Sequence, residues 1–181
     1  PLADKPQRGK NLTQEQAVQI VKSAFPIPDN ASLTGANYNE YKNDETAEVN
    51  SSWNLNWQMK DGDKEVGSVY AAIDSDTGII RNFNQYRYRP SDARNGSSRV
   101  AYADAKNKAV DVVKKQLPWL TDQLYAVEPS QDEIDQMGKN PDLDRYSFRF
   151  VRKSGGARIA SDSVRVDIDA GSGDVSNYWA E

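Results

Sequence analysis

The sequence has neither cysteine nor histidine among its 181 residues. Without cysteine the chain cannot form disulfides, thiolate metal sites or cysteine nucleophiles. Without histidine it lacks the base of Ser-His-Asp and Cys-His catalytic arrangements and a usual ligand of zinc. These two absences exclude most familiar hydrolytic and zinc-dependent sites, and we expect no catalytic activity and no cofactor.

Positive charge and long apolar runs are also scarce. The chain has 23 Lys and Arg against 27 Asp and Glu, a net charge of −4. A general nucleic-acid binder usually needs a basic face, so we expect no nucleic-acid partner. No apolar run approaches the ~20 residues of a membrane-spanning helix. Since the sequence begins with Pro1, we expect a processed product or a piece of a longer protein.

The feature that organises the sequence is a repeat. Residues 69–83, VYAAIDSDTGIIRNF, recur 95 positions later as residues 164–178, VRVDIDAGSGDVSNY. Alternating apolar residues, an Asp, a few small polar residues and a Gly predict a β-hairpin in each. An apolar helical segment ending in proline occurs at residues 17–26 and recurs 92 positions later at residues 109–118. Two segments that recur in the same order indicate a tandem duplication.

The first unit is predicted to be one helix followed by strands. The helix should begin at Thr13, where Gln16 completes a capping box, and should end before Pro26. Residues 52–60 alternate strictly between apolar and polar side chains, which is typical of a strand with one buried and one solvated face. Further strands are predicted at residues 33–42, 66–73 and 79–88.

The second unit is predicted to follow the same plan. Its helix should span residues 100–117, and Tyr146, Phe148 and Phe150 repeat the alternation of a half-buried strand. The acidic stretch 128–144 is interpreted as a surface loop or a short irregular helix. Further strands are predicted at residues 124–127, 159–168 and 174–179, with a turn at 154–156.

The predicted fold class is therefore α+β, with two tandem units. Each unit is one helix packed on an antiparallel β-meander of three to four strands. Whether the units share one core stays open. The predicted boundaries are an N-terminal linker at 1–11, a first repeat at 12–89, a linker rich in turn residues at 90–98 and a second repeat at 99–181.

The hairpin turns are the best-defined local feature. Asp74 and Asp169 can each close an Asx turn, and Gly78 and Gly173 supply the positive φ that such a turn needs. Residues 74–78 also resemble a calcium loop, but they lack the third acidic position and the distal Glu of that motif. We therefore interpret both turns as structural and expect no metal.

Four aromatic residues are candidates for an interaction surface. Trp53 and Trp57 point to the same side of their strand, and core packing is favoured over a ligand platform. Tyr86 and Tyr88 belong to the run 85–89, QYRYR, which mixes aromatic and basic residues as some single-strand nucleic-acid binders do. Protection of an edge strand is the favoured interpretation of that run.

One pair of carboxylates needs a separate interpretation. Asp167 and Asp169 lie two residues apart on a predicted strand, so their side chains should share a face. Paired carboxylates can perform acid/base chemistry. No second carboxylate motif accompanies them, so a solvated sheet face is favoured.

The combined pattern resembles a known family. A helix of the form AVxIVKxxFP, a WxLxW strand and a VxxxIDxxTGxIxxF hairpin are similar to the PepSY-like YcdB/YcdC repeated domain of secreted and cell-envelope proteins in Gram-positive bacteria. The resemblance covers nearly the whole chain as two consecutive copies. It implies a helix packed on an antiparallel sheet and an extracellular or cell-envelope location. It also implies a relation to PepSY domains in protease propeptides, which inhibit their enzyme or assist its folding.

Two functions follow as expectations. The first is a non-catalytic extracellular protein-interaction module that inhibits or chaperones a secreted protease, or binds another envelope protein, by strand addition or through its sheet face. The alternative is a structural spacer in a cell-surface protein, such as an S-layer or wall-anchored protein. An enzyme is disfavoured, because general acid/base catalysis most often recruits histidine.

Overall fold

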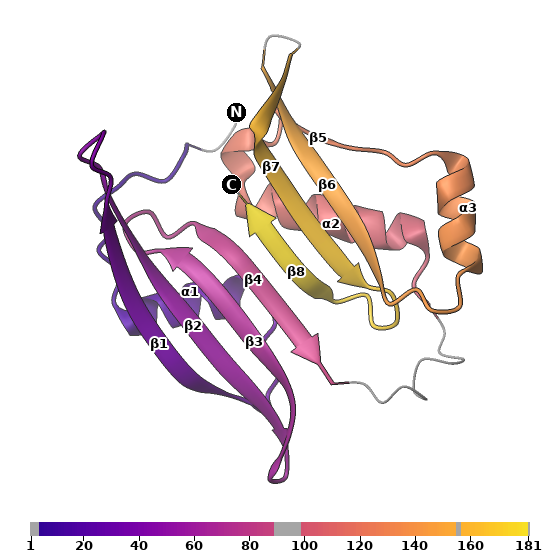
Figure 1. Ribbon diagram of the computed structural model, residues 1–181, viewed down its shortest axis with the longest axis horizontal. Helices are drawn as coiled ribbons and strands as arrows, with labels where there is room; N and C mark the ends of the chain where they lie inside the picture. Colours follow the sequence, from indigo (N-terminus) through magenta and orange to yellow (C-terminus); the bar gives the residue numbers. More distant parts are fainter. Residues whose placement is uncertain (1–3, 89–98, 155–156, 181) are drawn as a thin grey trace. The chain divides into compact units, whose positions relative to one another are not determined.

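The computed structural model describes residues 4–88, 99–154 and 157–180 (Figure 1). The chain divides into two compact units, of which the first comprises residues 4–87 and the second begins at Tyr88. Both are of the α+β class with antiparallel strands, which confirms the predicted class. The predicted linker at 90–98 and two residues of the predicted turn at 154–156 lie outside the described residues.

The first unit begins with the predicted helix α1 (Gln14–Ala24). Thr13 is the N-cap, and its hydroxyl accepts a hydrogen bond from the Gln16 amide while the Gln16 side chain accepts one from the Thr13 amide. This reciprocal capping box satisfies two amides that the first turn of a helix leaves without partners. The helix buries Ala17 and Val21, which lie four residues apart and therefore on one face.

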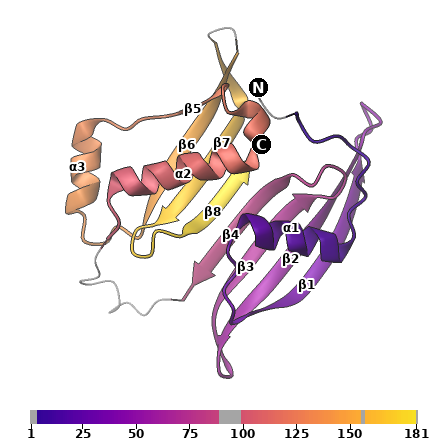
Figure 2. The same ribbon diagram turned by 180° about the vertical axis from the view of Figure 1, so that it is seen from behind.

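Four strands of the first unit form an antiparallel meander. They are β1 (Ala31–Lys42), β2 (Val49–Asp61), β3 (Lys64–Asp74) and β4 (Ile80–Arg87), paired in sequence order. Helix α1 covers one face of this sheet (Figure 2). That face carries Leu55, Trp57 and Met59 of β2, which are at most 2% exposed. The alternation predicted over residues 52–60 is confirmed.

The second unit repeats a helix and four antiparallel strands. Helix α2 (Tyr102–Gln116) is followed by the 3₁₀ turn η2 (Pro118–Leu120), the short strand β5 (Leu124–Ala126) and helix α3 (Gln131–Lys139). The remaining strands are β6 (Arg145–Ser154), β7 (Ala157–Asp169) and β8 (Val175–Ala180), and the order in the sheet is β5-β6-β7-β8. Helix α2 lies across one face of β6 and β7 (Figure 2).

The core of the second unit matches that of the first. Tyr146, Phe148 and Phe150 of β6 are buried, as the alternation predicted. Their partners on β7 and β8 include Ile168 and Tyr178, which are fully buried. The buried residues of α2 are Ala105, Ala109 and Val113. The last two stand 92 positions after Ala17 and Val21 of α1, so the helices match at their C-terminal ends, and α2 has one extra turn at its start.

Helix α3 differs from what the sequence analysis expected. The stretch 128–144 was interpreted as a loop or a short irregular helix, but it contains nine residues of regular α-helix. Ser130 and Glu133 form a capping box like that of Thr13 and Gln16. This motif is legible in the sequence, yet α3 buries no residue, so it lacks the apolar stripe that identifies most helices.

We expect Trp57→Ala to lower the free energy of unfolding by ~3–5 kcal/mol, because Trp57 is 2% exposed and its loss leaves a large cavity. Tyr41→Ala is the control, since Tyr41 is 65% exposed on the same sheet and should change stability by less than about 0.5 kcal/mol. Urea denaturation of both variants measures the difference. Equal effects would contradict the assignment of Trp57 to the core.

Candidate functional site

The turn between β3 and β4 is closed by Asp74. Its Oδ1 accepts hydrogen bonds from the amides of Asp76 at 3.0 Å and Thr77 at 2.9 Å. The Gly78 amide donates to the Asp74 carbonyl at 2.8 Å, and Gly78 has a φ of +76°. A residue with a Cβ is strained at that angle, so the backbone favours glycine at this position.

The turn between β7 and β8 has the same bonds. Asp169 Oδ1 accepts from the amides of Gly171 at 2.9 Å and Ser172 at 2.8 Å, and Gly173 donates to the Asp169 carbonyl at 2.9 Å. The φ of Gly173 is +73°. In both turns an Asp oxygen is occupied by neighbouring amides. Within residues 4–88, 99–154 and 157–180, no three acidic, His or Cys side chains gather in an arrangement suited to a metal.

Each helix is attached to the turn of its own unit. In the first unit the Leu12 amide donates to the Ser75 carbonyl at 2.8 Å, and the Trp53 indole Nε1 donates to the Leu12 carbonyl at 2.7 Å. Leu12 directly precedes the N-cap of α1. Both polar groups of its backbone are therefore bound to the sheet. We call this arrangement the helix clamp.

The second unit has its own helix clamp. The Val100 amide donates to the Ala170 carbonyl at 3.0 Å, and the Tyr146 hydroxyl donates to the Val100 carbonyl at 3.1 Å. Val100 directly precedes Ala101, the N-cap of α2. Ala170 stands 95 positions after Ser75, so the clamp uses equivalent turn residues in both units. An indole and a phenol perform the same donor role.

The four aromatic candidates have different environments. Trp57 is buried, so it cannot form part of a surface. Trp53 is half-buried, its indole is used in the clamp, and its ring packs edge-on against Tyr38 at 5.3 Å. Tyr86 and Tyr88 are 57% and 52% exposed. The structure therefore assigns the two tryptophans to the core and its rim, and leaves only the two tyrosines exposed.

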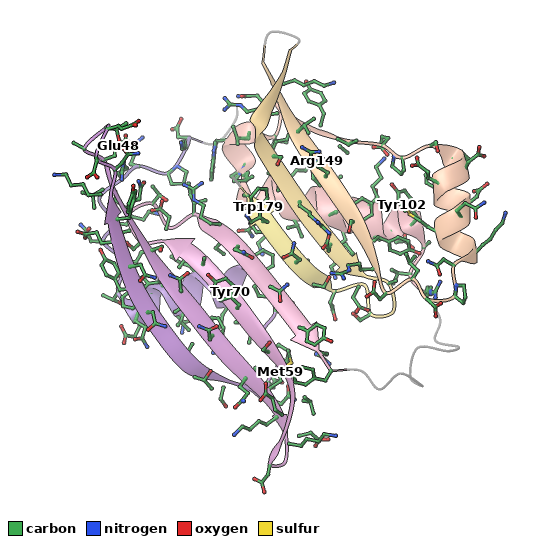
Figure 3. All side chains as sticks on the ribbon, in the orientation of Figure 1. Glu48, Met59, Tyr70, Tyr102, Arg149 and Trp179 are labelled. Atoms are coloured by element: carbon green, nitrogen blue, oxygen red, sulfur yellow. The ribbon has the colours of Figure 1, made fainter. Side chains whose placement is uncertain are left out.

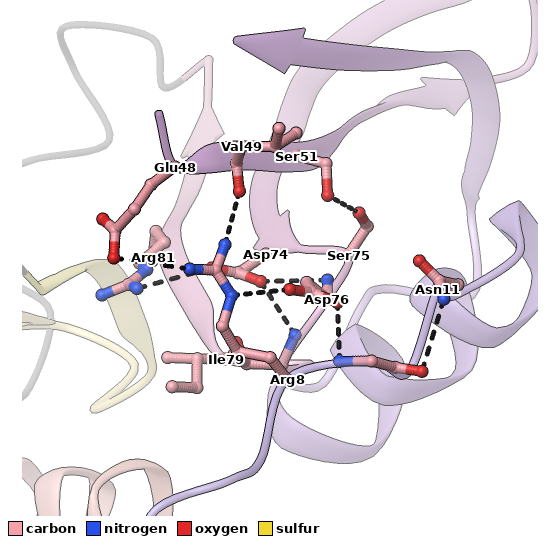
Figure 4. A network of polar contacts seen from close by, with 12 residues as sticks. Arg8, Asn11, Glu48, Val49, Ser51, Asp74, Ser75, Asp76, Ile79 and Arg81 are labelled. Carbon is pink, nitrogen blue, oxygen red and sulfur yellow. Dashed lines mark hydrogen bonds and ion pairs between the residues drawn. The ribbon is translucent and has the colours of Figure 1, made fainter. Parts of the chain in front are cut away.

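Residues 8–10 are held against the first turn rather than extending freely (Figure 4). Arg8 Nε lies 2.7 Å from Asp76 Oδ2, and the Gly9 amide donates to Asp76 Oδ1 at 2.7 Å. The Lys10 amide donates to the Asp76 carbonyl at 2.9 Å, and Arg8 also donates to the Val49 carbonyl. This part of the predicted linker is thus bound to the first unit.

The strap formed by residues 8–10 lowers the pKa of Asp76. The hydrogen bond from Arg8 is the main cause, and the bond from the Gly9 amide adds to it, because both stabilise the ionised carboxylate. The second turn has Gly171 where the first has Asp76, so it cannot make the same side-chain contacts.

The predicted solvated face at Asp167 and Asp169 is wrong. Asp167 is 1% exposed, and Asp169 closes the turn. Arg165 makes a two-pronged contact with Asp167, Nε to Oδ1 at 2.9 Å and Nη2 to Oδ2 at 3.1 Å. Arg145 Nη1 approaches Asp167 Oδ2 at 3.9 Å. Guanidinium groups from two strands, β6 and β7, thus approach this carboxylate, and sequence periodicity cannot reveal such neighbours.

The first unit also has an open strand edge. Strand β1 pairs with β2 and stands at the end of the strand order. Its residues from Ala31 to Asn39 include no charge and no proline. Exposed large side chains on or beside this edge are Leu33, Tyr38, Tyr41 and Val49.

No helix in the described part of the chain is long and apolar enough to cross a membrane.

Comparison with known proteins gives a family and a fold. A family model described as the YcdB, YcdC repeated domain matches residues 14–181. The structure is similar to that of the Bacillus megaterium YpeB C-terminal domain, with a TM-score of 0.61 and 20% sequence identity. The match covers 95% of this chain and 64% of that one, so this chain spans less than two thirds of it. A search of curated proteins found no match.

We expect Gly173→Ala to destabilise the protein by about 1–2 kcal/mol through its left-handed backbone. The added Cβ would also stand 3.0 Å from Val100 Cγ1, at the clamp. Gly138→Ala in α3 is the matched control, because nothing lies within 4 Å of its added Cβ and alanine favours helix. Thermal melting of both variants measures the difference. An unchanged melting temperature for Gly173→Ala would refute the role of Gly173 in the turn.

The lowered pKa of Asp76 predicts an acid-sensitive strap. A carboxylate whose folded pKa is depressed stabilises the folded state above its unfolded pKa of about 3.9, and that contribution disappears as the pH falls through the folded pKa. Carboxyl NMR should therefore show Asp76 titrating below the usual range. Arg8→Gln should raise this pKa, whereas Arg81→Gln, which removes a partner of Asp74, should leave it unchanged. Identical titrations in both variants would contradict the assignment.

Proposed function

The chain belongs to the YcdB, YcdC repeated domain family, and we propose that it is a non-catalytic, extracellular or cell-envelope module that binds another protein through the edge of β1. A secreted protease is the partner class we favour, with inhibition or assisted folding as the consequence. The proposal combines the family with one structural observation, the open edge of β1.

The edge of β1 supports strand addition by a partner. Edge strands expose unpaired amides and carbonyls, and soluble proteins usually protect them with lysine, proline or a bulge. Strand β1 has a bulge between Leu33 and Gly35, and its charged residues, Glu40 and Lys42, are confined to its last three positions. The intervening segment from Ala36 to Asn39 is left without such protection. An extended peptide can pair with it through main-chain hydrogen bonds.

Side chains around the edge could add specificity. Tyr38 is 48% exposed and Tyr41 65% exposed, and tyrosine is enriched at protein interfaces because it combines a large apolar ring with a hydroxyl. Tyr38 is positioned by its edge-on contact with Trp53. The aromatic residue that serves the helix clamp therefore also supports the rim of the proposed interface.

The acidic groups with defined contacts have structural uses, which supports a non-catalytic role. Asp74 and Asp169 close turns, Asp76 holds the strap, and Asp167 pairs with Arg165. A general acid or base needs a reactive carboxylate beside a space for substrate. Each of these four carboxylates is instead occupied by amides or guanidinium groups of its own unit.

We also infer that the two units arose by tandem duplication. The repeated helix clamp supports this inference, because in both units it joins equivalent turn and strand positions to the residue that precedes the N-cap of the helix. The alternative function, a spacer that extends the reach of a surface protein, is favoured by this serial arrangement of compact units.

The test is a pull-down from the secreted and cell-wall fraction of the native host, followed by mass spectrometry. A specific protein should be retained, and the double variant Asn37→Lys with Asn39→Lys should lose it because edge lysines oppose strand pairing. The control is Gln131→Lys with Gln136→Lys on the exposed face of α3, which adds the same charge elsewhere.

Inhibition kinetics follow if the retained protein is a protease. Retention by both double variants would show that β1 is not the interface. Retention of wall material, or of nothing, would favour the spacer.

A further inference from the structure

We propose that the sheet of the second unit binds a short acidic peptide segment on the face opposite α2. A carboxylate of the peptide would be held between Arg149 and Arg165, and an apolar side chain would pack against Trp179. This site uses a different unit and a different surface from the β1 edge, so neither proposal depends on the other.

The three residues form a row across neighbouring strands. Arg149 of β6 is directly opposite Arg165 of β7, and Arg165 is directly opposite Trp179 of β8. Their sequence neighbours Phe148, Val166 and Tyr178 are buried on the side of α2, so the row lies on the other face. Arg149 and Trp179 are labelled in Figure 3. Arg149 is exposed, and Trp179 is 37% exposed.

Two arginines directly opposite each other are unfavourable in an isolated sheet. Cross-strand pairs stand about 4.5–5.5 Å apart at Cβ, and like charges in such a pair destabilise the sheet. This chain has a net charge of −4, so it has many carboxylates that could neutralise such a pair of arginines. An anionic group bound between Arg149 and Arg165 would convert the repulsion into two charge-assisted hydrogen bonds.

Arg165 is already held in place for this role. Its Nε and Nη2 contact the two oxygens of Asp167 at 2.9 and 3.1 Å, and Nη2 also donates to Ser147 Oγ at 3.3 Å. Asp167 is 1% exposed, whereas the Arg165 side chain is 53% exposed. The buried carboxylate therefore orients a guanidinium whose remaining donors face solvent. Asp167 is a positioning residue, not a ligand contact.

Arg149 has no comparable neutralising partner. In the described part of the chain, no side chain forms a hydrogen bond or an ion pair with its guanidinium. Asp167 is committed to Arg165 and is approached by Arg145, so it does not serve Arg149. All five donors of the Arg149 guanidinium are thus available to a ligand.

The surrounding charge favours a short acidic peptide over a long polyanion. A nucleic acid or another extended polyanion gains affinity from many basic residues along its path, but this chain is acidic overall. A single carboxylate needs only the Arg pair. Trp179 adds an apolar surface of the kind that a peptide side chain can cover.

The spacing also suits a peptide. Strands lie about 4.8 Å apart, so Arg149 and Trp179, two strands apart, are separated by roughly 10 Å across the sheet. An extended peptide advances about 3.3 Å per residue. A carboxylate midway between Arg149 and Arg165 lies roughly 7 Å from Trp179, about two residues of an extended peptide. Side chains two residues apart also point to the same side of such a peptide, so one could reach the arginines and the other Trp179.

The experiment uses four capped octapeptides that cross Glu or Gln at one position with Phe or Ala two positions later. Binding to the full chain is measured by NMR shifts of the Trp179 indole and by titration at low and high salt. The Glu/Phe peptide should bind best, and the Arg149→Gln variant should weaken it about tenfold, since a hydrogen bond to a charged group is lost. Arg87→Gln, which removes an exposed arginine of β4, should leave binding unchanged.

Stability separates a ligand site from a structural one. Arg149→Gln should leave the melting temperature unchanged or raise it, because the repulsion with Arg165 is relieved. Equal binding of the Glu and Gln peptides, or equal weakening by Arg149→Gln and Arg87→Gln, would overturn the proposal. Tighter binding of a polyphosphate than of the Glu/Phe peptide, or self-association that accounts for the Trp179 shifts, would also overturn it.

Discussion

The helix clamp is the interaction on which each unit depends. A helix laid on a sheet by apolar contact alone can slide, because burial is non-directional. Here the residue before each N-cap is bound at both its amide and its carbonyl, once to a turn and once to an aromatic side chain of a strand. These bonds fix where α1 and α2 begin and leave the buried alanines and valines to determine how closely they pack.

The helix clamp connects the two features that the sequence displays most clearly, the Asp and Gly hairpin turn and the alternating strand with its inward aromatic residue. The Asp and Gly of each hairpin shape a turn whose next carbonyl receives the amide of Leu12 or Val100. The first inward aromatic residue of the strand that precedes each hairpin, Trp53 of β2 or Tyr146 of β6, supplies the second bond. The motif that identifies the repeat is therefore also the motif that attaches its helix. This explains why both turns have a glycine with a positive φ, +76° for Gly78 and +73° for Gly173.

Much of the fold could be predicted from the sequence, because it depends on local patterns. Strict alternation located β2 and β6, and a capping box located the start of α1. Helix α3 was left open between a surface loop and a short irregular helix, since it buries nothing and only Ser130 and Glu133 mark its start. The burial of Asp167 and its ion pairs with Arg165 and Arg145 could not be predicted either, because they depend on how neighbouring strands pack and not on periodicity. Trp53 and Trp57 looked equivalent in the sequence, and only three-dimensional contacts separate a clamp donor from a core residue.

The bonds from Leu12 and Val100 reach main-chain carbonyls in the turns, and this has a consequence for divergence between the copies. The residue that supplies the carbonyl is Ser75 in one unit and Ala170 in the other, and the residue after it is Asp76 or Gly171. Side chains at these positions can therefore change without loss of the attachment that positions the helix. One copy uses this freedom to bind residues 8–10 through Asp76, and the other carries Gly171 at the equivalent position. A repeat built in this way can acquire different surfaces in each copy while its framework remains constant.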